Sequence, residues 1–455
     1  MPTWHRRSGT SRPSGPDRLP PDPLTGSPGQ MAAPPKKDHV KLVMLGMLHM
    51  AQYFPAAFTG VALPFLFRKE GLPIEMFWLL ALPGIPRWLK WLIALLVDNY
   101  GSARIGYRKT WIIPCTAIGA AAYAVLAWIP PSVTAVYVIV GILLVKSFIM
   151  AAQDIAVDGY AAESMTDAER ATGTSIIVFL AILAGVMGSG VVALVETFGW
   201  PRTMLGASAL MLAAAAPAII RREPPPPEAT RRRRERGERP NLWKALRRRE
   251  SRYILPYLFV FGFGGTFFGS MIGPFFADKG LTLTQFGILA PVAAIAGGGL
   301  GALATPWLVE RIGMSRTAII GVAALPVEGF IFSALALYPG LPVLPMLTLI
   351  VALLGFVTSI YSFVVNNSRF RWASKAQAAT DYSMQSSIWN FGVWAAGSVA
   401  GFVVGGAGWA VFFPIAGCLA GAGGVLYNVN FDPKGTMVRR PQRHRHDPPP
   451  HAGKE

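Results

Sequence analysis

Charged side chains interrupt two long apolar stretches in the first half of this sequence. Arg87 and Lys90 lie three positions apart within the run 75–97, so a helix there carries both cations on one face. Asp154 and Asp158 lie four positions apart at the end of a later apolar run and also share a helix face. Because a charge among apolar groups is costly unless it has a partner, each pair predicts either a functional lining or ion pairs.

The two pairs indicate complementary chemistry. A cationic face formed by Arg87 and Lys90 attracts an anionic solute, although long cationic side chains also extend toward water or form structural pairs. Asp154 and Asp158 repel each other unless a cation or a proton lies with them, so one of them is a candidate proton carrier. The alternative is a structural cluster of these carboxylates with Lys90 or Arg108.

A cluster of charged residues follows the first of these stretches. Asp98, Arg108 and Lys109 surround Gly106, and such a network can hold two helices together in one conformation and release them in another. The alternative is charge that marks a cytoplasmic loop, with Trp111 as an interfacial anchor. The predicted gating network comprises Asp98, Gly106, Arg108, Lys109, Glu163, Arg170, Glu310 and Arg311.

Polar side chains are also dense near the end of the second half. Amide, carboxyl and hydroxyl groups around Asn366 and Asp381 lie in an apolar region, where such groups either join helices or line a pathway. The predicted solute and proton pathway comprises Arg87, Lys90, Gln153, Asp154, Asp158, Asn366, Asn367, Asp381 and Gln385.

The motifs of other chemistries are missing from the sequence. It contains no G-x-x-x-x-G-K-S/T nucleotide-binding loop, no nucleophile elbow and no metal-ligand spacing, so we expect no enzyme activity, no metal and no other cofactor. Cys115 and Cys418 both lie in apolar runs and provide no disulfide framework. His49 is expected to be a packed polar residue and not a metal ligand.

Long apolar helices must position these residues. Of the 455 residues, 52% are hydrophobic and 15% are charged, too little charge for a soluble domain of this size. The apolar runs have about 20 residues, enough for a helix to cross a hydrocarbon core, and they do not alternate as in a β-barrel. The sequence therefore predicts an all-α polytopic membrane protein with twelve spans, near 41–66, 75–97, 111–129, 133–155, 172–196, 203–220, 253–277, 283–308, 316–338, 342–364, 379–404 and 408–428.

The composition divides the chain into two six-helix bundles. The segment 221–252 combines four consecutive prolines with dense charge, which is typical of a solvated linker. We predict a disordered tail at 1–40, bundles at 41–220 and 253–428 on either side of the basic linker, and a second disordered tail at 429–455. Two such bundles are typical of transporters that bind their solute between the halves near the middle of the membrane.

The basic residues indicate both orientation and partners. The net charge is +18, yet the odd-numbered loops contain only Arg68, Lys69, Arg202 and Lys279. Because cytoplasmic segments are enriched in Lys and Arg, we expect both termini in the cytoplasm. The run Arg231–Arg234 is then expected to contact anionic lipids and no nucleic acid. We expect the protein to be a monomer.

Three groups of residues each match a different sequence pattern. The groups are Lys90-Trp91 to Asp98 with Gly106-Tyr107-Arg108-Lys109-Thr110-Trp111; Gln153 to Asp158 with Glu169-Arg170 and Gly173; and Ala379-Thr380-Asp381-Tyr382. They resemble the K-F-L-W…D…G-R-R-x-x-W, Q-D-I-x-x-D…E-E-R-G-x-G and A-T-Q-Y patterns of AmpG-type permeases in the major facilitator superfamily. The likeness covers about residues 42 to 428. Departures are Tyr107 at the first Arg of the pattern and Leu92-Ile93-Ala94-Leu95 in place of W-A-P.

The resemblance implies a twelve-helix permease of a bacterial inner membrane that imports its solute into the cytoplasm. Relatives of this kind carry anhydro-muropeptides, siderophores (the RhtX and FptX type) or acetyl-CoA. We predict proton-coupled symport of a bulky, anionic or peptide-like solute, with a muropeptide as the leading candidate and a siderophore as the alternative. A non-transporting membrane sensor or scaffold is the competing hypothesis from another class.

Overall fold

The computed structural model describes residues 38–102, 104–221, 223, 246–247, 251–338 and 378–430, with short stretches between 352 and 372. In these ranges all regular elements are helices, and β pairing is limited to one isolated bridge between Ser102 and Gly106. Nine helical stretches of the described chain are long and apolar enough to cross a membrane. The predicted all-α polytopic fold is therefore confirmed.

The first half contains the helices of spans one to six. They are α1 (His39–Ala57), the π-helix η1 (Phe58–Ala62), α2 (Leu63–Lys69), η2 (Ile74–Phe77), α3 (Trp78–Ala81), η3 (Leu82–Gly84), α4 (Ile85–Trp88), α5 (Lys90–Asn99), α6 (Lys109–Leu126), α7 (Val136–Ser164), α8 (Asp167–Phe198) and α9 (Trp200–Ile220). Helix α8 begins at a capping box, in which Thr166 and Glu169 satisfy each other's backbone N–H groups. The Asp38 carboxylate caps α1 by accepting from the Lys41 N–H at 3.0 Å.

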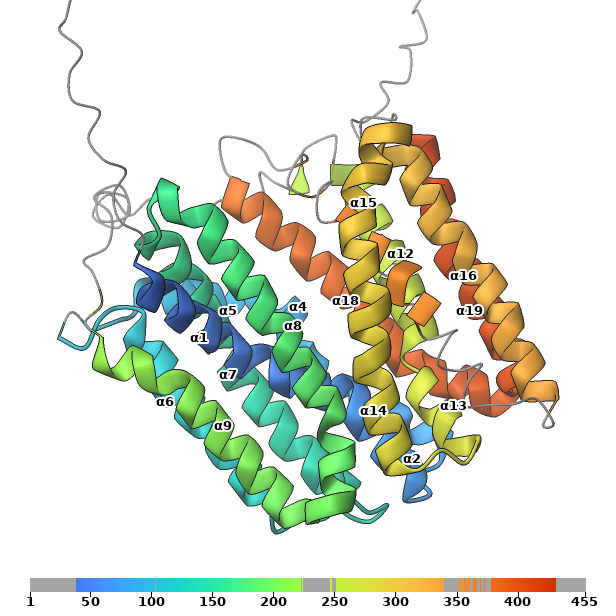
Figure 1. Cartoon of the computed structure of the whole chain (residues 1–455), viewed down its shortest axis with the longest axis horizontal. Coiled ribbons are helices and arrows are strands. Elements are labelled where there is room, and N and C mark those ends of the chain that lie inside the picture. The colour runs from blue at the N-terminus through green and yellow to red at the C-terminus, as the bar shows by residue number, and fades with distance from the viewer. Residues whose placement is uncertain are drawn as a thin grey trace, which may run out of the picture. The chain divides into compact units, whose positions relative to one another are not determined.

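The second half contains the remaining described helices. They are α12 (Ser251–Gly269), α13 (Ile272–Asp278), α14 (Leu283–Ala293), the π-helix η4 (Ala294–Gly298), α15 (Gly299–Ile312), α16 (Met314–Leu337), α18 (Ala378–Ala407) and α19 (Trp409–Asn430). In Figure 1, α1 and α6 to α9 form one group, and α12, α15, α16 and α19 form another. The predicted span 342–364 lies largely outside the described residues.

Several spans differ from uninterrupted rods of 20 residues. Span two is a series of short helices, because Pro83 and Pro86 lack the N–H that a continuous helix needs. Spans one and seven both end in a short helix with a proline near its start, Pro64 in α2 and Pro274 in α13. Helix α7 has 29 residues, about 44 Å, so it extends well beyond the predicted end at 155. Asp154 and Asp158 consequently lie inside this helix and not at its end.

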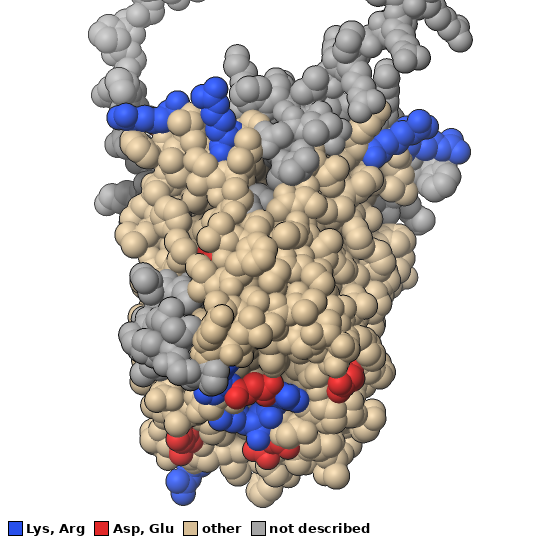
Figure 2. All heavy atoms as spheres, turned by 90° about the vertical axis from the view of Figure 1, so that its right-hand side faces the viewer, with Lys and Arg blue, Asp and Glu red and all other residues tan. Residues whose placement is uncertain are grey.

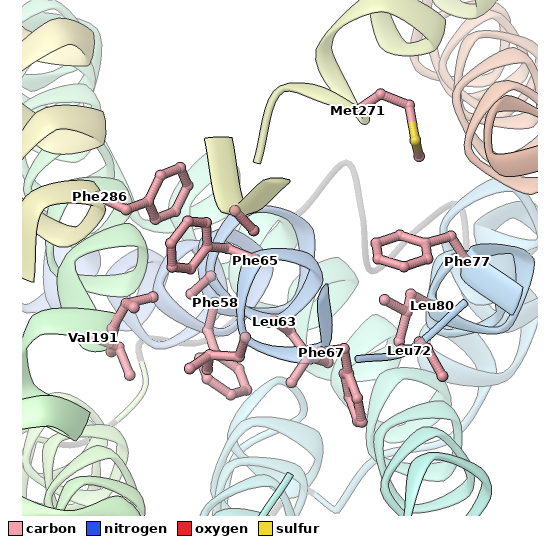
Figure 3. Close-up of a cluster of buried hydrophobic side chains, with 14 of the residues drawn as sticks. Phe58, Leu63, Phe65, Phe67, Leu72, Phe77, Leu80, Val191, Met271 and Phe286 are labelled. Atoms are coloured by element: carbon pink, nitrogen blue, oxygen red, sulfur yellow. The ribbon is translucent and has the colours of Figure 1, made fainter. Parts of the chain in front are cut away.

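Aromatic side chains and small residues join the two halves. The rings of Phe65 in α2 and Phe286 in α14 stack with centroids 4.0 Å apart, as Figure 3 shows. Helix α8 packs along α14, where Gly287 lies so close to Ala193 that a side chain at position 287 would overlap it. Figure 2 shows one face on which Lys, Arg, Asp and Glu side chains lie mostly toward the two ends, with a broad band between them that carries few of these residues.

Candidate functional site

A cavity of about 490 Å³ lies between the two halves. Residues of α1, η1, the broken span two and α7 line it from the first half, and residues of α12 and α18 line it from the second. The breaks in span two matter here, because they place short helices with different directions along one wall. This volume is in the range of sites that bind drug-sized molecules.

The charged residues of the cavity all come from the first half. Arg87, Lys90, Lys146 and Asp154 line it, whereas the lining residues of α12 and α18 are uncharged. The polar groups of the second half are neutral and include Thr266 and Asn390. Three cations face one carboxylate, so the cavity has a net positive wall when all four groups are ionised. A positive wall favours an anionic occupant.

Lys90 and Asp154 form an ion pair across the cavity wall. Lys90 is the first residue of α5, directly after the break of span two, and this position turns its ammonium toward α7. About a quarter of each side chain is exposed, so the pair is accessible from the cavity. In this structure Lys90 therefore neutralises the Asp154 carboxylate.

Asp158 has a different partner from Asp154. Its Oδ1 lies 3.3 Å from Nε2 of His49, whose Nδ1 lies 2.8 Å from the Leu45 carbonyl oxygen. Asp158 does not line the cavity, and 59% of its side chain is exposed. The two carboxylates on this helix face therefore have different partners, Lys90 for Asp154 and His49 for Asp158. His49 is a buried polar residue of α1.

Gln153 and Gln385 are deeply buried, and neither lines the cavity. Within the described part of the chain, both polar atoms of Gln153 and Oε1 of Gln385 have no hydrogen-bond partner. Asn390, one turn beyond the predicted segment of α18, does line the cavity. Asn366, Asn367 and the side chain of Asp381 lie outside the described residues.

Lys146 is a cavity residue that the sequence did not single out. It lies two turns before Asp154 in α7 and is 4% exposed. Its Nζ lies 5.5 Å from the centroid of the Tyr123 ring, a cation–π arrangement. The only sequence signal for it is a lysine inside an otherwise apolar run, which also fits a side chain that extends toward water.

An aromatic group lies on the α18 side of the cavity. Trp394, which lines the cavity, stacks on Phe391 with centroids 5.8 Å apart and also contacts Trp88 at 5.9 Å. Trp88 comes from α4 and the other two rings from α18, so the group joins the two halves. Flat rings of this kind offer a stacking surface to a planar or apolar part of a ligand.

Arg108, in the predicted gating network, forms an ion pair with Glu163. Its Nη2 lies 2.7 Å from Oε1 and its Nε lies 3.3 Å from Oε2, a bidentate arrangement that connects the start of α6 to the end of α7. Gly159 makes room for the guanidinium, because any side chain there would overlap it. Both partners are largely buried. The pair lies wholly within the first half.

Glu223 at the start of the linker completes this cluster. Its carboxylate accepts hydrogen bonds from the backbone N–H groups of Arg108, at 3.0 and 3.1 Å, and of Lys109, at 3.0 Å. Gly106 has a positive φ of 116° and no side chain, which leaves space for this carboxylate. The Lys109 ammonium donates to the Arg221 carbonyl. Sequence reasoning missed Glu223 because only the tertiary structure brings position 223 to the start of α6.

Two further ion pairs extend the cluster along the same end. Lys41 donates to Glu169 at 2.6 Å, and this hydrogen bond is the main reason that the pKa of Glu169 is lowered to about 2. Arg221 pairs with Asp38, and its hydrogen bond holds the pKa of Asp38 below the usual value. These pairs join the starts of α1 and α8 to the end of α9.

The other predicted network residues lie elsewhere or are not described. Glu310 and Arg311 are exposed at the end of α15, where Arg311 stacks over the Trp307 ring at 4.9 Å. The side chains of Asp98 and Arg170 lie outside the described residues. Among the described residues, no three His, Cys, Asp or Glu side chains group as metal ligands.

A salt bridge joins the halves at the opposite end of the helices. Arg68, in α2, donates from Nε to Oδ1 of Asp278 at 2.6 Å and from Nη2 to Oδ2 at 2.9 Å. Trp409, at the start of α19, donates to the same carboxylate at 2.9 Å. Glu196, near the end of α8, accepts from the hydroxyl of Thr284 in the first turn of α14 at 2.7 Å.

The profile of the Major Facilitator Superfamily matches residues 45–327. The chain belongs to the major facilitator superfamily. A Haemophilus influenzae relative, an uncharacterized protein, is 23% identical over 285 residues, which cover 60% of this chain and 66% of that protein, just under two thirds of its length. The major facilitator superfamily contains the AmpG-type permeases, whose sequence patterns this chain resembles.

Solved structures share the fold at low sequence identity. The nucleoside transporter NupG has a TM-score of 0.65 at 16% identity, covering 85% of this chain and 99% of that chain. A D-xylose-proton symporter has a TM-score of 0.63 at 14% identity, covering 88% of this chain and 99% of that chain. A POT family transporter in complex with a thioalcohol conjugated peptide has a TM-score of 0.66 at 10% identity, covering 86% of this chain and 95% of that chain. These likenesses show the major facilitator fold.

Proposed function

We propose that this major facilitator protein imports a bulky anionic or peptide-like solute across the bacterial inner membrane by symport with protons. The observation that carries the proposal is the cavity of about 490 Å³ between the halves, whose charged wall contains three cations and one carboxylate. A muropeptide from peptidoglycan recycling is the leading solute, and a siderophore is the alternative. Both have anionic groups and extended polar surfaces that suit such a cavity.

Proton coupling is assigned to Asp154. While Asp154 is ionised, Lys90 is its partner and is not available to a solute. Protonation of the carboxylate would release the Lys90 ammonium toward the cavity, so that proton binding and anion binding support each other. The D-xylose-proton symporter shares this fold, which is compatible with coupling to protons.

The predicted orientation places both termini, the basic linker and the Arg108 cluster at the cytoplasmic face. The run Arg231–Arg234 of the linker, which lies outside the described residues, is proposed to contact anionic lipids there. A monomer is sufficient for this mechanism, because the cavity is built by one chain. A reporter fused after position 430, active only in the cytoplasm, tests the orientation.

Transport in proteoliposomes tests the proposal. Labelled anhydro-muropeptide should accumulate when an inward proton gradient is imposed, and a protonophore should abolish the accumulation. Asp154→Asn should retain exchange without accumulation, whereas Asp158→Asn, outside the cavity, should retain both. If neither the protonophore nor Asp154→Asn changes the uptake, the hypothesis of proton coupling is excluded.

A gene deletion distinguishes the candidate solutes. Loss of labelled anhydro-muropeptides from the periplasm supports the first, and failure of siderophore-dependent growth under iron limitation supports the second. A membrane sensor or scaffold would show neither phenotype, and no counterflow of any candidate solute.

A further inference from the structure

The cavity cations differ in whether a carboxylate neutralises them. Lys90 is paired with Asp154. Neither Arg87 nor Lys146 has an Asp or Glu within ion-pair distance among the residues that the structure describes. The excess positive charge of the cavity therefore resides on Arg87 and Lys146.

Lys146 is the more demanding of these two cations. Arg87 is exposed, so water can solvate its guanidinium, whereas the Lys146 side chain is 4% exposed. An ammonium in this environment is costly unless an anion or several hydrogen bonds compensate it. The Tyr123 ring, 5.5 Å away, offers only a partial substitute.

The geometry of α7 keeps Lys146 apart from the ion pair. Lys146, Met150 and Asp154 recur every four residues and all line the cavity, so they form one stripe along its wall. Eight residues of helix correspond to about 12 Å, which is too far for Lys146 to pair with Asp154. Along this stripe, Asp154 is therefore neutralised by Lys90, whereas Lys146, two turns away, has no carboxylate partner among the described residues.

The opposite wall has a different character. The residues of α12 and α18 that line the cavity carry no charge, and they include Thr266, Asn390 and Trp394. Trp394 belongs to the aromatic group with Phe391. A solute that fits both walls has an anionic group at one side and an uncharged, partly apolar body at the other.

We propose that Lys146, with Arg87 in the same cavity lining, anchors the anionic group of the solute, a carboxylate or a phosphate. The uncharged wall with Asn390 and Trp394 receives the rest of the solute. This inference rests on the proposed function, since it assigns the solute class of the same cavity. It also makes Lys146 a specificity-determining residue.

Three sugars of one skeleton test the assignment. N-acetylglucosamine is neutral, N-acetylmuramic acid adds a carboxylate, and N-acetylglucosamine 6-phosphate adds a phosphate. Binding to the purified full-length chain is measured as the rise in melting temperature over a concentration series. We expect the two anions to bind, the neutral sugar to bind about tenfold or more weakly, and the stronger anion to identify the anionic group.

Variants locate the anion. Lys146→Met should weaken anion binding by about tenfold or more and leave neutral-sugar binding unchanged, whereas Lys146→Arg should stay within about threefold of the wild type. Arg87→Gln, at an exposed position, gives a second and smaller loss if Lys146→Met does not fold. Arg202→Gln, at an exposed residue in the first turn of α9 and outside the cavity lining, is the matched control.

The outcomes separate the inference from the proposed function. Equal melting curves with all three sugars, or anion binding unchanged in both Lys146→Met and Arg87→Gln, would overturn the assignment. Counterflow in proteoliposomes is measured independently with the same sugars. Flux without charge dependence retains transport and rejects the anion anchor, while charge-dependent binding without flux retains the anchor and rejects transport.

Discussion

The two ends of the helix bundles use ionic contacts differently. At one end, Arg68 and Asp278 connect α2 of the first half to α13 of the second. At the other end, the described ion pairs, Arg108–Glu163, Lys41–Glu169 and Arg221–Asp38, all stay within the first half and the start of the linker. The comparison shows a molecule whose halves are held together at the Arg68 end, while the ion pairs at the Arg108 end stabilise a single half.

The contact at the Arg68 end has internal symmetry. Pro64-Phe65 in span one and Pro274-Phe275 in span seven are equivalent, and Arg68 and Asp278 each follow their proline by four positions. Each short helix is followed, directly after its C-cap residue, by a glycine with φ of 85°. Equivalent positions of the two repeats thus carry opposite charges and meet across the interface. With the proposed orientation, the closed end faces away from the cytoplasm.

The largest effect is expected for Arg108→Ala. Glu163 would keep its largely buried position without its bidentate partner, at a cost of about 3–5 kcal/mol. The melting temperature of the purified protein should fall strongly. The double variant with Glu163→Ala should be less destabilised than the sum of the single variants, and strict additivity would show that the pair does not act as a unit.

Gly401→Val should open the Arg68 end. Any side chain at position 401 of α18 would overlap the Ile74 carbonyl oxygen of η2, so the halves must separate there, at about 1–3 kcal/mol. Spin labels on Lys69→Cys and Gln285→Cys should move apart in electron paramagnetic resonance. Gly406→Val is the matched control, because no atom of a neighbouring residue lies within 4 Å of the point where its side chain would begin. Equal distances in both variants would contradict tight contact at Gly401.

Acid should weaken the Arg108 end through Glu169. The pKa of Glu169 is lowered from about 4.5 to about 2, mainly by the Lys41 hydrogen bond, so its ionised form favours the folded state. This contribution, on the order of 1–3 kcal/mol, is complete above about pH 5 and is lost as the pH falls toward 2. Glu169→Gln should lower the melting temperature at pH 7 and flatten its dependence on pH over this window. If the melting temperatures of the wild type and of Glu169→Gln instead fall in parallel between pH 5 and pH 2, Glu169 is not the group responsible for the acid sensitivity.

The smallest effect is expected for Arg68→Gln. About a quarter of each side chain of the Arg68–Asp278 pair is exposed, and such pairs contribute about 0.2–1 kcal/mol. The melting temperature should hardly change, but the balance between closed and open ends should shift by up to about fivefold. The Lys69 and Gln285 spin labels measure this shift, and Arg202→Gln supplies the control for loss of an exposed cation.

Much of the fold could be predicted from the sequence. Apolar runs of about 20 residues indicated the helices, because a bilayer allows few other ways to satisfy the backbone. The length of α7 was underestimated, because a helix can continue past the apolar run when Glu163 and Ser164 find partners at its end.

The candidate site could be predicted only in part. Arg87, Lys90 and Asp154 line the cavity. Ionisable residues in apolar helices usually face the interior of the bundle or a water-filled cavity, so their sequence positions could suggest this. Gln153 and Asp158 do not line the cavity, although they are neighbours of Asp154 in sequence or on its helix face. Sequence spacing defines a helix face, but the packing of α1 and α5 against α7 decides which part of that face meets the cavity.

The sequence by itself determined that this is an all-α membrane protein and which charges lie within its apolar helices, because hydrophobic length and local spacing follow directly from residue order. Only the tertiary structure decided how those charges are paired. Lys90 meets Asp154, Glu223 meets the start of α6 and Lys146 meets an aromatic ring, because residues distant in sequence come together when the helices pack. That pairing leaves the excess positive charge of the cavity on Arg87 and Lys146.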